Sequence, residues 1–170
     1  LNTETCSTGS LSLQWREIRK TKAGVIKLAD NAKIKLILKQ TADGSTDSSE
    51  LFTRGEFREH GGSFFIDYDE SEATGYAGSH VQLRIGQLDD TVTMTRTGKA
   101  FSSLVFENGK RHFCQYGTEY GDCMIGISTV DMRNGMTSDG GELYVRYTID
   151  VNSGLMLENE ITIHVKPHNN

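Results

Sequence analysis

The chain has 170 residues and a net charge of −5, which suits one domain able to bury a core without disulfides or metal. The charge is unevenly distributed. Residues 1–39 carry eight Lys/Arg and three Asp/Glu, whereas residues 40–170 carry ten Lys/Arg and twenty Asp/Glu. The acidic body argues against nucleic-acid binding, and the odd number of cysteines, three, argues against a disulfide framework. With no run of transmembrane length and no secretory signal, a cytoplasmic protein that does not enter a membrane is expected.

Residues 1–32 are expected to form a flexible or weakly helical N-terminal arm. Residues 1–10 are rich in Ser and Thr, a composition typical of a disordered end. Apolar residues between Leu11 and Lys22 then follow helical spacing until Gly24 interrupts them. The basic arm is either a solvated segment or a contact for an acidic partner.

From Ile34 to Val165 apolar residues fall on every second position in one segment after another, which predicts strands with one buried face. Asn108-Gly109 and other Gly-rich turns separate these segments, and no helix pattern falls between them. Residues 33–166 are therefore expected to form an all-β domain, a closed antiparallel barrel of eight to ten strands in a mainly up-and-down meander. Ten strands are expected: 33–41, 50–60, 62–70, 79–87, 89–97, 100–107, 110–117, 119–133, 141–152 and 156–166.

Two stretches, Thr41–Ser49 and Ser71–Gly78, are rich in Ser, Thr, Gly and acidic residues and are expected to be loops. The alternate positions of the strands carry charges such as Lys35, Arg84 and Glu160. Charges on a lipid-facing surface would be costly, so the apolar face is expected to be the inside of a soluble barrel.

Polar side chains interrupt the inward-facing apolar pattern near one mouth of the predicted barrel. Arg96 continues the inward positions of Val92 and Met94, and Tyr68 and Glu70 continue those of an earlier strand. A buried guanidinium needs an acceptor. Two interpretations stay open: Arg96 pairs with Glu70 or with carbonyl groups and closes one end of the barrel, or it binds an anionic ligand in a pocket.

The stretch Tyr116-Gly117-Thr118-Glu119-Tyr120-Gly121 is expected to form a tight corner or bulge, since two glycines bracket it. A phosphate-binding loop is the weaker alternative, because no lysine or helix follows.

No metal, cofactor or catalytic residue is expected. His112, Cys114 and Cys123 lack the spacing of a zinc site, and no fourth ligand is evident. The acidic run from Asp67 to Glu72 is expected to be a solvated rim rather than a site for a hard cation.

Several short motifs together resemble the YwiB-like family, a group of small bacterial proteins. They are Tyr68-Asp69-Glu70, Met94-Thr95-Arg96-Thr97-Gly98, the Tyr116–Gly121 stretch and Ser128-Thr129, and the resemblance runs from about residue 33 to residue 166. It implies a calycin-like, lipocalin-shaped barrel and no particular activity. The family's motif positions fall on the candidate ligand-binding residues, which are Tyr68, Glu70, Arg96, Tyr116, Thr118 and Glu119.

Three functions are compatible with these residues. The first is a barrel that binds a small amphipathic or anionic ligand. The second is a structural or protein-interaction module with a filled barrel, whose arm around Trp15 docks on a partner or on a second copy to form a homodimer. The third, which nothing in the residue spacing requires, is an enzyme that uses Glu70 or Glu119 as acid or base beside a tyrosine.

Overall fold

The structure is a computed structural model that describes residues 30–118, 121–151 and 154–168. Most of the predicted N-terminal arm, residues 1–29, lies outside the described residues. The described residues form ten strands, as the alternation predicts, and one short 3₁₀ turn. They are β1 (Ala32–Ala42), β2 (Ser45–His60), β3 (Ser63–Asp69), η1 (Glu72–Thr74), β4 (His80–Gly86), β5 (Thr91–Thr97), β6 (Ser102–Glu107), β7 (Arg111–Thr118), β8 (Gly121–Asn134), β9 (Gly141–Val151) and β10 (Leu155–Pro167).

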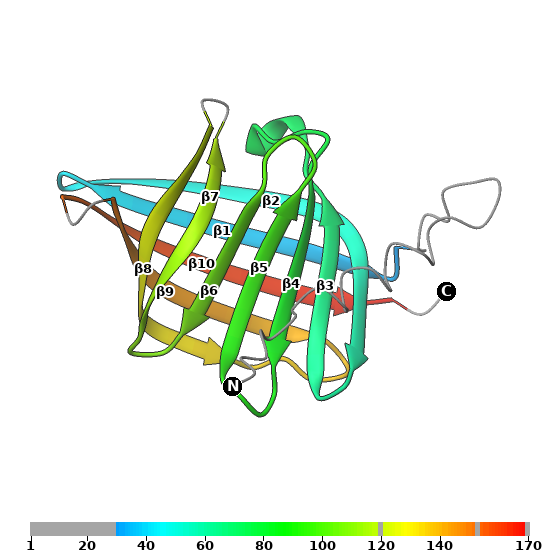
Figure 1. Ribbon diagram of the computed structural model, residues 1–170. Helices are drawn as coiled ribbons and strands as arrows, with labels where there is room; N and C mark the ends of the chain where they lie inside the picture. Colours follow the sequence, from blue (N-terminus) through cyan, green and yellow to red (C-terminus); the bar gives the residue numbers. More distant parts are fainter. Residues whose placement is uncertain (1–29, 119–120, 152–153, 169–170) are drawn as a thin grey trace, which may run out of the picture.

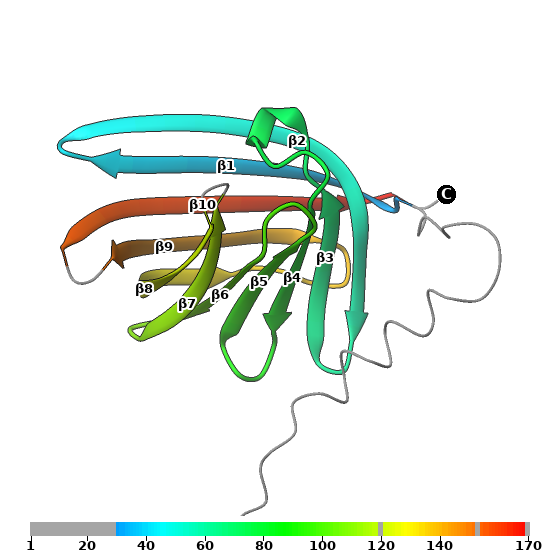
Figure 2. The ribbon, with the colours of Figure 1, turned by 45° about the horizontal axis from the view of Figure 1, so that its top comes forward.

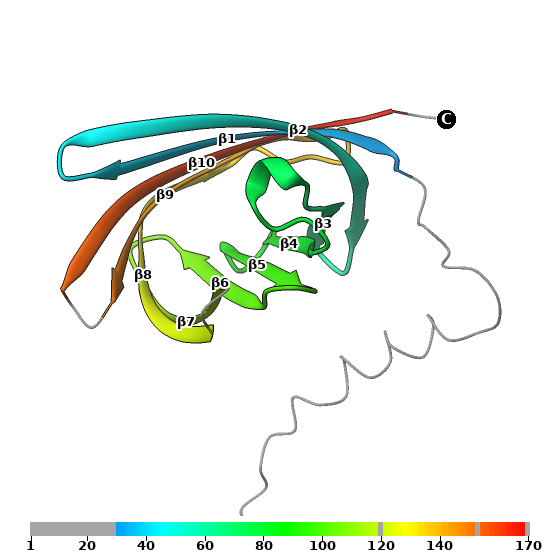
Figure 3. The same cartoon turned by 90° about the horizontal axis from the view of Figure 1, so that it is seen from above.

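The strands form one closed antiparallel barrel in which each strand pairs with the next and β1 pairs with β10. The predicted all-β up-and-down barrel is therefore confirmed. The long strands β1, β2, β9 and β10 form one curved wall that extends beyond the shorter strands β3–β7 (Figure 1). Seen from above, η1 lies between this wall and strands β3–β5 (Figure 3).

Strand β2 changes partners at Gly55. Residues 45–55 pair with β1, and residues 55–60 pair with β3, so Gly55 is the one residue of β2 that belongs to both ladders. Figure 2 shows β2 curving from the long wall towards β3. A side chain on residue 55 would collide with the carbonyl oxygen of Asp67, which explains the glycine. Within the described chain, residues 45–54 have a ladder partner on one side only.

The predicted loop Thr41–Ser49 is instead mostly strand. Its turn is limited to Asp43 and Gly44, both of which have positive φ (49° and 79°), and β2 begins at Ser45. Residues 43–50 are exposed, because this hairpin projects beyond the core. Both faces of this segment contact water, so apolar and polar residues need not alternate along it, and its sequence shows no strand pattern.

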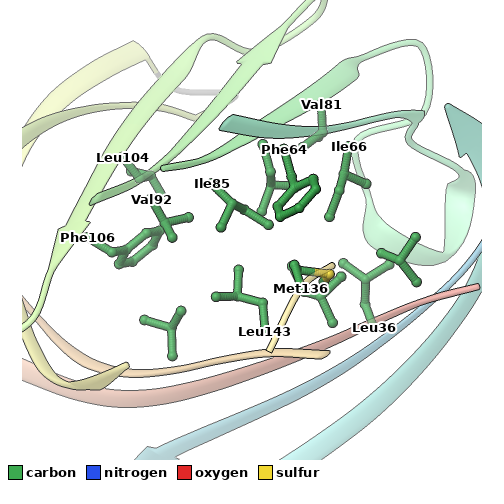
Figure 4. Close-up of a cluster of buried hydrophobic side chains, with 14 of the residues drawn as sticks. Leu36, Phe64, Ile66, Val81, Ile85, Val92, Leu104, Phe106, Met136 and Leu143 are labelled. Atoms are coloured by element: carbon green, nitrogen blue, oxygen red, sulfur yellow. The ribbon is translucent and has the colours of Figure 1, made fainter. Parts of the chain in front are cut away.

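The core is the interior of the barrel. Side chains from β3–β6, among them Ile66, Ile85 and Phe106, face Leu36 and Leu143 of the long wall across the interior (Figure 4). Each large aliphatic or aromatic side chain removed from water in this way contributes about 1.5–3 kcal/mol. This burial is what makes the alternation in the sequence predictive of the fold.

A hydrogen-bonded charge cluster lies on the outer face of β3 and β4. His80 uses both ring nitrogens: Nδ1 lies 2.9 Å from Oδ1 of Asp69, and Nε2 lies 3.3 Å from Oδ1 of Asp67. Gln82 also donates to Asp67, at 2.7 Å. The hydrogen bond to Asp67 is the main reason that the pKa of His80 is raised, with Asp69 adding to it and partial burial opposing it.

The folded protein should therefore gain stability from protonated His80. Because its pKa is raised on folding, this contribution is complete below the ordinary histidine pKa and is lost as the pH rises through the folded pKa. We expect His80→Gln to cost up to about 1 kcal/mol in mildly acidic solution and less at alkaline pH, since the side chain is partly exposed. Urea unfolding of both proteins across this range measures the difference.

Proton NMR titration of His80 gives an independent check. Asp67→Asn should move the His80 midpoint downwards, because it replaces the charged acceptor that raises this pKa most with a neutral one. A wild-type midpoint at or below that of an unstructured histidine would contradict the prediction.

Candidate ligand site in the barrel

The barrel contains a cavity of about 260 Å³ beneath η1. Residues 49–51 of β2 border it on one side, and Ala73, Thr74 and Tyr76 border it on the other. Most of its lining is apolar and comes from side chains that alternation aims inward. The apolar residues of the lining, besides those already named, are Leu36, Leu38, Leu83, Val92, Met94, Phe106, Leu143, Val145, Ile161 and Ile163.

One corner of the cavity is charged. Nε and Nη2 of Arg96 both donate to Oε1 of Glu70, at 3.2 and 3.1 Å, and the two side chains are only 11% and 3% exposed. The predicted inward projection of Arg96 and Glu70 is thus confirmed. Of the two interpretations drawn from the sequence, the pairing of Arg96 with Glu70 is the one that the structure shows. The other carboxylate oxygen, Oε2, is buried and has no hydrogen-bond partner among the described residues.

Tyr76 covers the charged corner from the segment that follows η1. The guanidinium carbon of Arg96 lies 3.9 Å from the centre of the Tyr76 ring, and the Tyr76 hydroxyl lies 3.1 Å from that of Tyr116. Two backbone bonds hold this loop, because Glu70 N–H donates to the Ser79 carbonyl and Ser79 N–H donates to the Tyr76 carbonyl, both at 2.9 Å. Tyr76 is therefore a site residue that the sequence pattern missed.

Tyr68, Tyr116 and Tyr147 stay neutral at physiological pH because the pKa of each is raised. Burial, with a smaller effect of the Tyr76 hydroxyl, raises the pKa of Tyr116 to about 12. Burial is also the main cause that raises the pKa of Tyr68 and of Tyr147, and the negative charge of Glu70 raises that of Tyr68 further. Such hydroxyl groups donate and accept hydrogen bonds but do not act as general bases near pH 7.

The structure brings together four of the six predicted site residues. Tyr68, Glu70 and Arg96 line the cavity, whereas Tyr116 reaches the cluster through its bond to Tyr76. Thr118 pairs with Gly121 in the β7–β8 ladder, within the stretch predicted to form a corner or bulge. Glu119 lies outside the described residues. The ligand-binding role of all six stays a prediction.

A second, more open hollow of about 310 Å³ adjoins the cavity. The two share Leu38, Ser49 and Ile161, and polar side chains such as Gln40 and Asn159 line the second one. The apolar cavity therefore lies next to a polar hollow, an arrangement that suits molecules with one apolar and one polar part.

The described residues give little support to a zinc site or another metal site. Among them, no three His, Cys, Asp or Glu side chains are grouped so as to hold a metal ion. Cys114 is buried, and its sulfur accepts a hydrogen bond from the Val105 amide at 3.3 Å. No helix in the described part of the chain has the length and apolar character needed to cross a bilayer.

Comparison with known proteins supports the fold. A family model described as "Domain of unknown function (DUF1934)" matches residues 34–163. The crystal structure of ywiB protein from Bacillus subtilis superposes with a TM-score of 0.67 at 14% identity, covering 82% of this chain and 93% of that one. A search of curated proteins gave no match. The resemblance to the YwiB-like family is thereby confirmed, and at this identity the structural match extends to the fold alone.

Proposed function

The chain belongs to the family described as Domain of unknown function (DUF1934), and from that premise we propose that its barrel binds a small amphipathic molecule in the lumen. The observation that carries the proposal is the cavity itself. Closely packed proteins leave few voids larger than a water molecule, and this one is about 260 Å³ and mostly apolar in its lining. The charged corner formed by Glu70 and Arg96 supplies the orienting polar contact that ligand pockets usually have.

The size of the cavity limits the ligand. One water-sized group occupies about 30 Å³, so the space accommodates a molecule of about nine non-hydrogen atoms. Octan-1-ol has this size and combines an apolar chain with one polar end, which makes it a suitable first probe.

Filling the lumen should abolish binding. We expect octan-1-ol to raise the melting temperature of the wild-type protein and to give saturable heat in isothermal titration calorimetry. Met94→Trp should remove both effects, because Met94 lines the cavity and the indole would occupy it. Thr95→Trp is the matched control, since this neighbour lies on the opposite face of β5, and it should bind octan-1-ol as the wild type does.

Equal binding by Met94→Trp and wild type would place the alcohol outside the lumen and contradict the proposal. If no probe of this size bound the wild type, the filled-barrel alternative, a structural or interaction module, would be favoured.

A further inference from the structure

We propose that the polar group of the ligand is a hydrogen-bond donor, a hydroxyl or an amine, and that it binds Oε2 of Glu70. This inference rests on the proposed function and specifies the class of ligand. Its basis is the imbalance of the charged corner: Arg96 directs two N–H groups at the same oxygen, Oε1, and leaves Oε2 buried without a partner among the described residues. A buried acceptor without a donor is costly, and a ligand that brings the donor removes that cost.

Arg96 is poorly placed to recruit an anion. Two of its five N–H groups, one on Nε and one on Nη2, are committed to Glu70, and the ring of Tyr76 covers one face of its guanidinium. An anionic group that entered this corner would also meet the carboxylate of Glu70, which is 3% exposed and so is little screened by water. The corner as a whole therefore selects against a second negative charge.

The surroundings of Glu70 offer no internal donor in place of the ligand. Tyr68 lines the same cavity, yet within the described chain its hydroxyl makes no hydrogen bond to Glu70. The Glu70 backbone N–H is already used, in its bond to Ser79. The Tyr76 and Tyr116 hydroxyls share one hydrogen bond, and neither of them bonds to Oε2. Oε2 has no donor among the described residues, and the donor that we propose comes from a molecule in the cavity that Glu70 lines.

A series of ligands similar in size but different in the polar group tests this inference. Octan-1-ol and heptyl methyl ether are isomers, and only the alcohol donates. Octanoate adds a negative charge, and octylamine adds a positively charged donor. We expect the alcohol and the amine to bind wild-type protein at least about tenfold more tightly than the ether or octanoate, because the ether cannot satisfy Glu70 and octanoate is repelled by it.

The variant Glu70→Gln provides a second test of the donor inference. Arg96 still needs an acceptor, so the amide oxygen of Gln should take the place of Oε1 and leave the NH₂ group towards the cavity. The advantage of the alcohol over the ether should then disappear. If this variant does not fold, the ligand series on wild-type protein decides the question alone.

The outcomes separate the two proposals. Equal binding of the alcohol and the ether, with both lost in Met94→Trp, would overturn the donor inference and leave lumen binding intact. Tightest binding of octanoate would show that Arg96 binds anions and would overturn the inference as well. Absence of binding by every member of the series would overturn both.

Discussion

Arg96→Met is expected to lower the free energy of unfolding by about 3–5 kcal/mol, because it leaves the buried carboxylate of Glu70 without its counter-charge. The cavity gives Glu70 little alternative solvation, since the lining around it is mostly apolar. Urea unfolding, followed by far-ultraviolet circular dichroism, measures the loss of unfolding free energy. We expect the same variant to lose the ring contact of Tyr76 as well.

Two comparisons isolate the effect of burial. Arg84→Met breaks a pair of similar geometry, in which Arg84 Nη2 lies 2.9 Å from Asp89, but the side chains are 38% and 49% exposed, and a cost below about 1 kcal/mol is expected. The double variant Arg96→Met/Glu70→Leu should recover most of the lost stability, because an apolar pair needs no compensation. Similar losses for Arg84→Met and Arg96→Met would show that the pair at the cavity is not effectively buried.

Gly55→Ala is expected to destabilise the barrel by about 3 kcal/mol, at the upper end of the usual cost of overpacking. The added Cβ would collide with the carbonyl oxygen of Asp67 and lie 2.9 Å from Cδ1 of Ile34. The backbone oxygen cannot move aside without disturbing the β2–β3 ladder, where Gly55 faces Tyr68. Thermal and urea unfolding report the loss.

Gly154→Ala is a matched control for this change. Its Cβ would have only an ordinary contact, 3.7 Å from the Val151 carbonyl oxygen, so an effect within about 0.5 kcal/mol is expected. If Gly55→Ala were equally mild, β2 would have room to bend elsewhere than at this residue.

The charged corner shows what residue alternation can and cannot predict. A period of two follows from strand geometry, so counting from apolar neighbours placed both Arg96 and Glu70 inside the barrel, and the structure pairs them. The count gives no information about loops. Tyr76 lies in an irregular segment, and its place over Arg96 depends on the closure of the barrel, which no local pattern encodes. An aromatic residue within a Ser-, Gly- and acid-rich loop was the only available signal.

The bounds of the strands followed the same logic. Where one face is buried, as in β4 and β9, predicted and observed ends differ by one residue at most. The start of β2 was missed, because its first residues are exposed on both faces. Burial therefore does not require apolar and polar residues to alternate there.

The change of partner at Gly55 has one more consequence, for how copies of the barrel meet. Residues 45–54 expose a row of backbone donors and acceptors, the kind of edge onto which a strand of another molecule can add and start aggregation. This edge reads Ser-Thr-Asp-Ser-Ser-Glu over its first six positions. An incoming strand would desolvate Asp47 and Glu50, which is costly. The polar run that kept the start of β2 from being predicted therefore also protects the barrel from adding further strands.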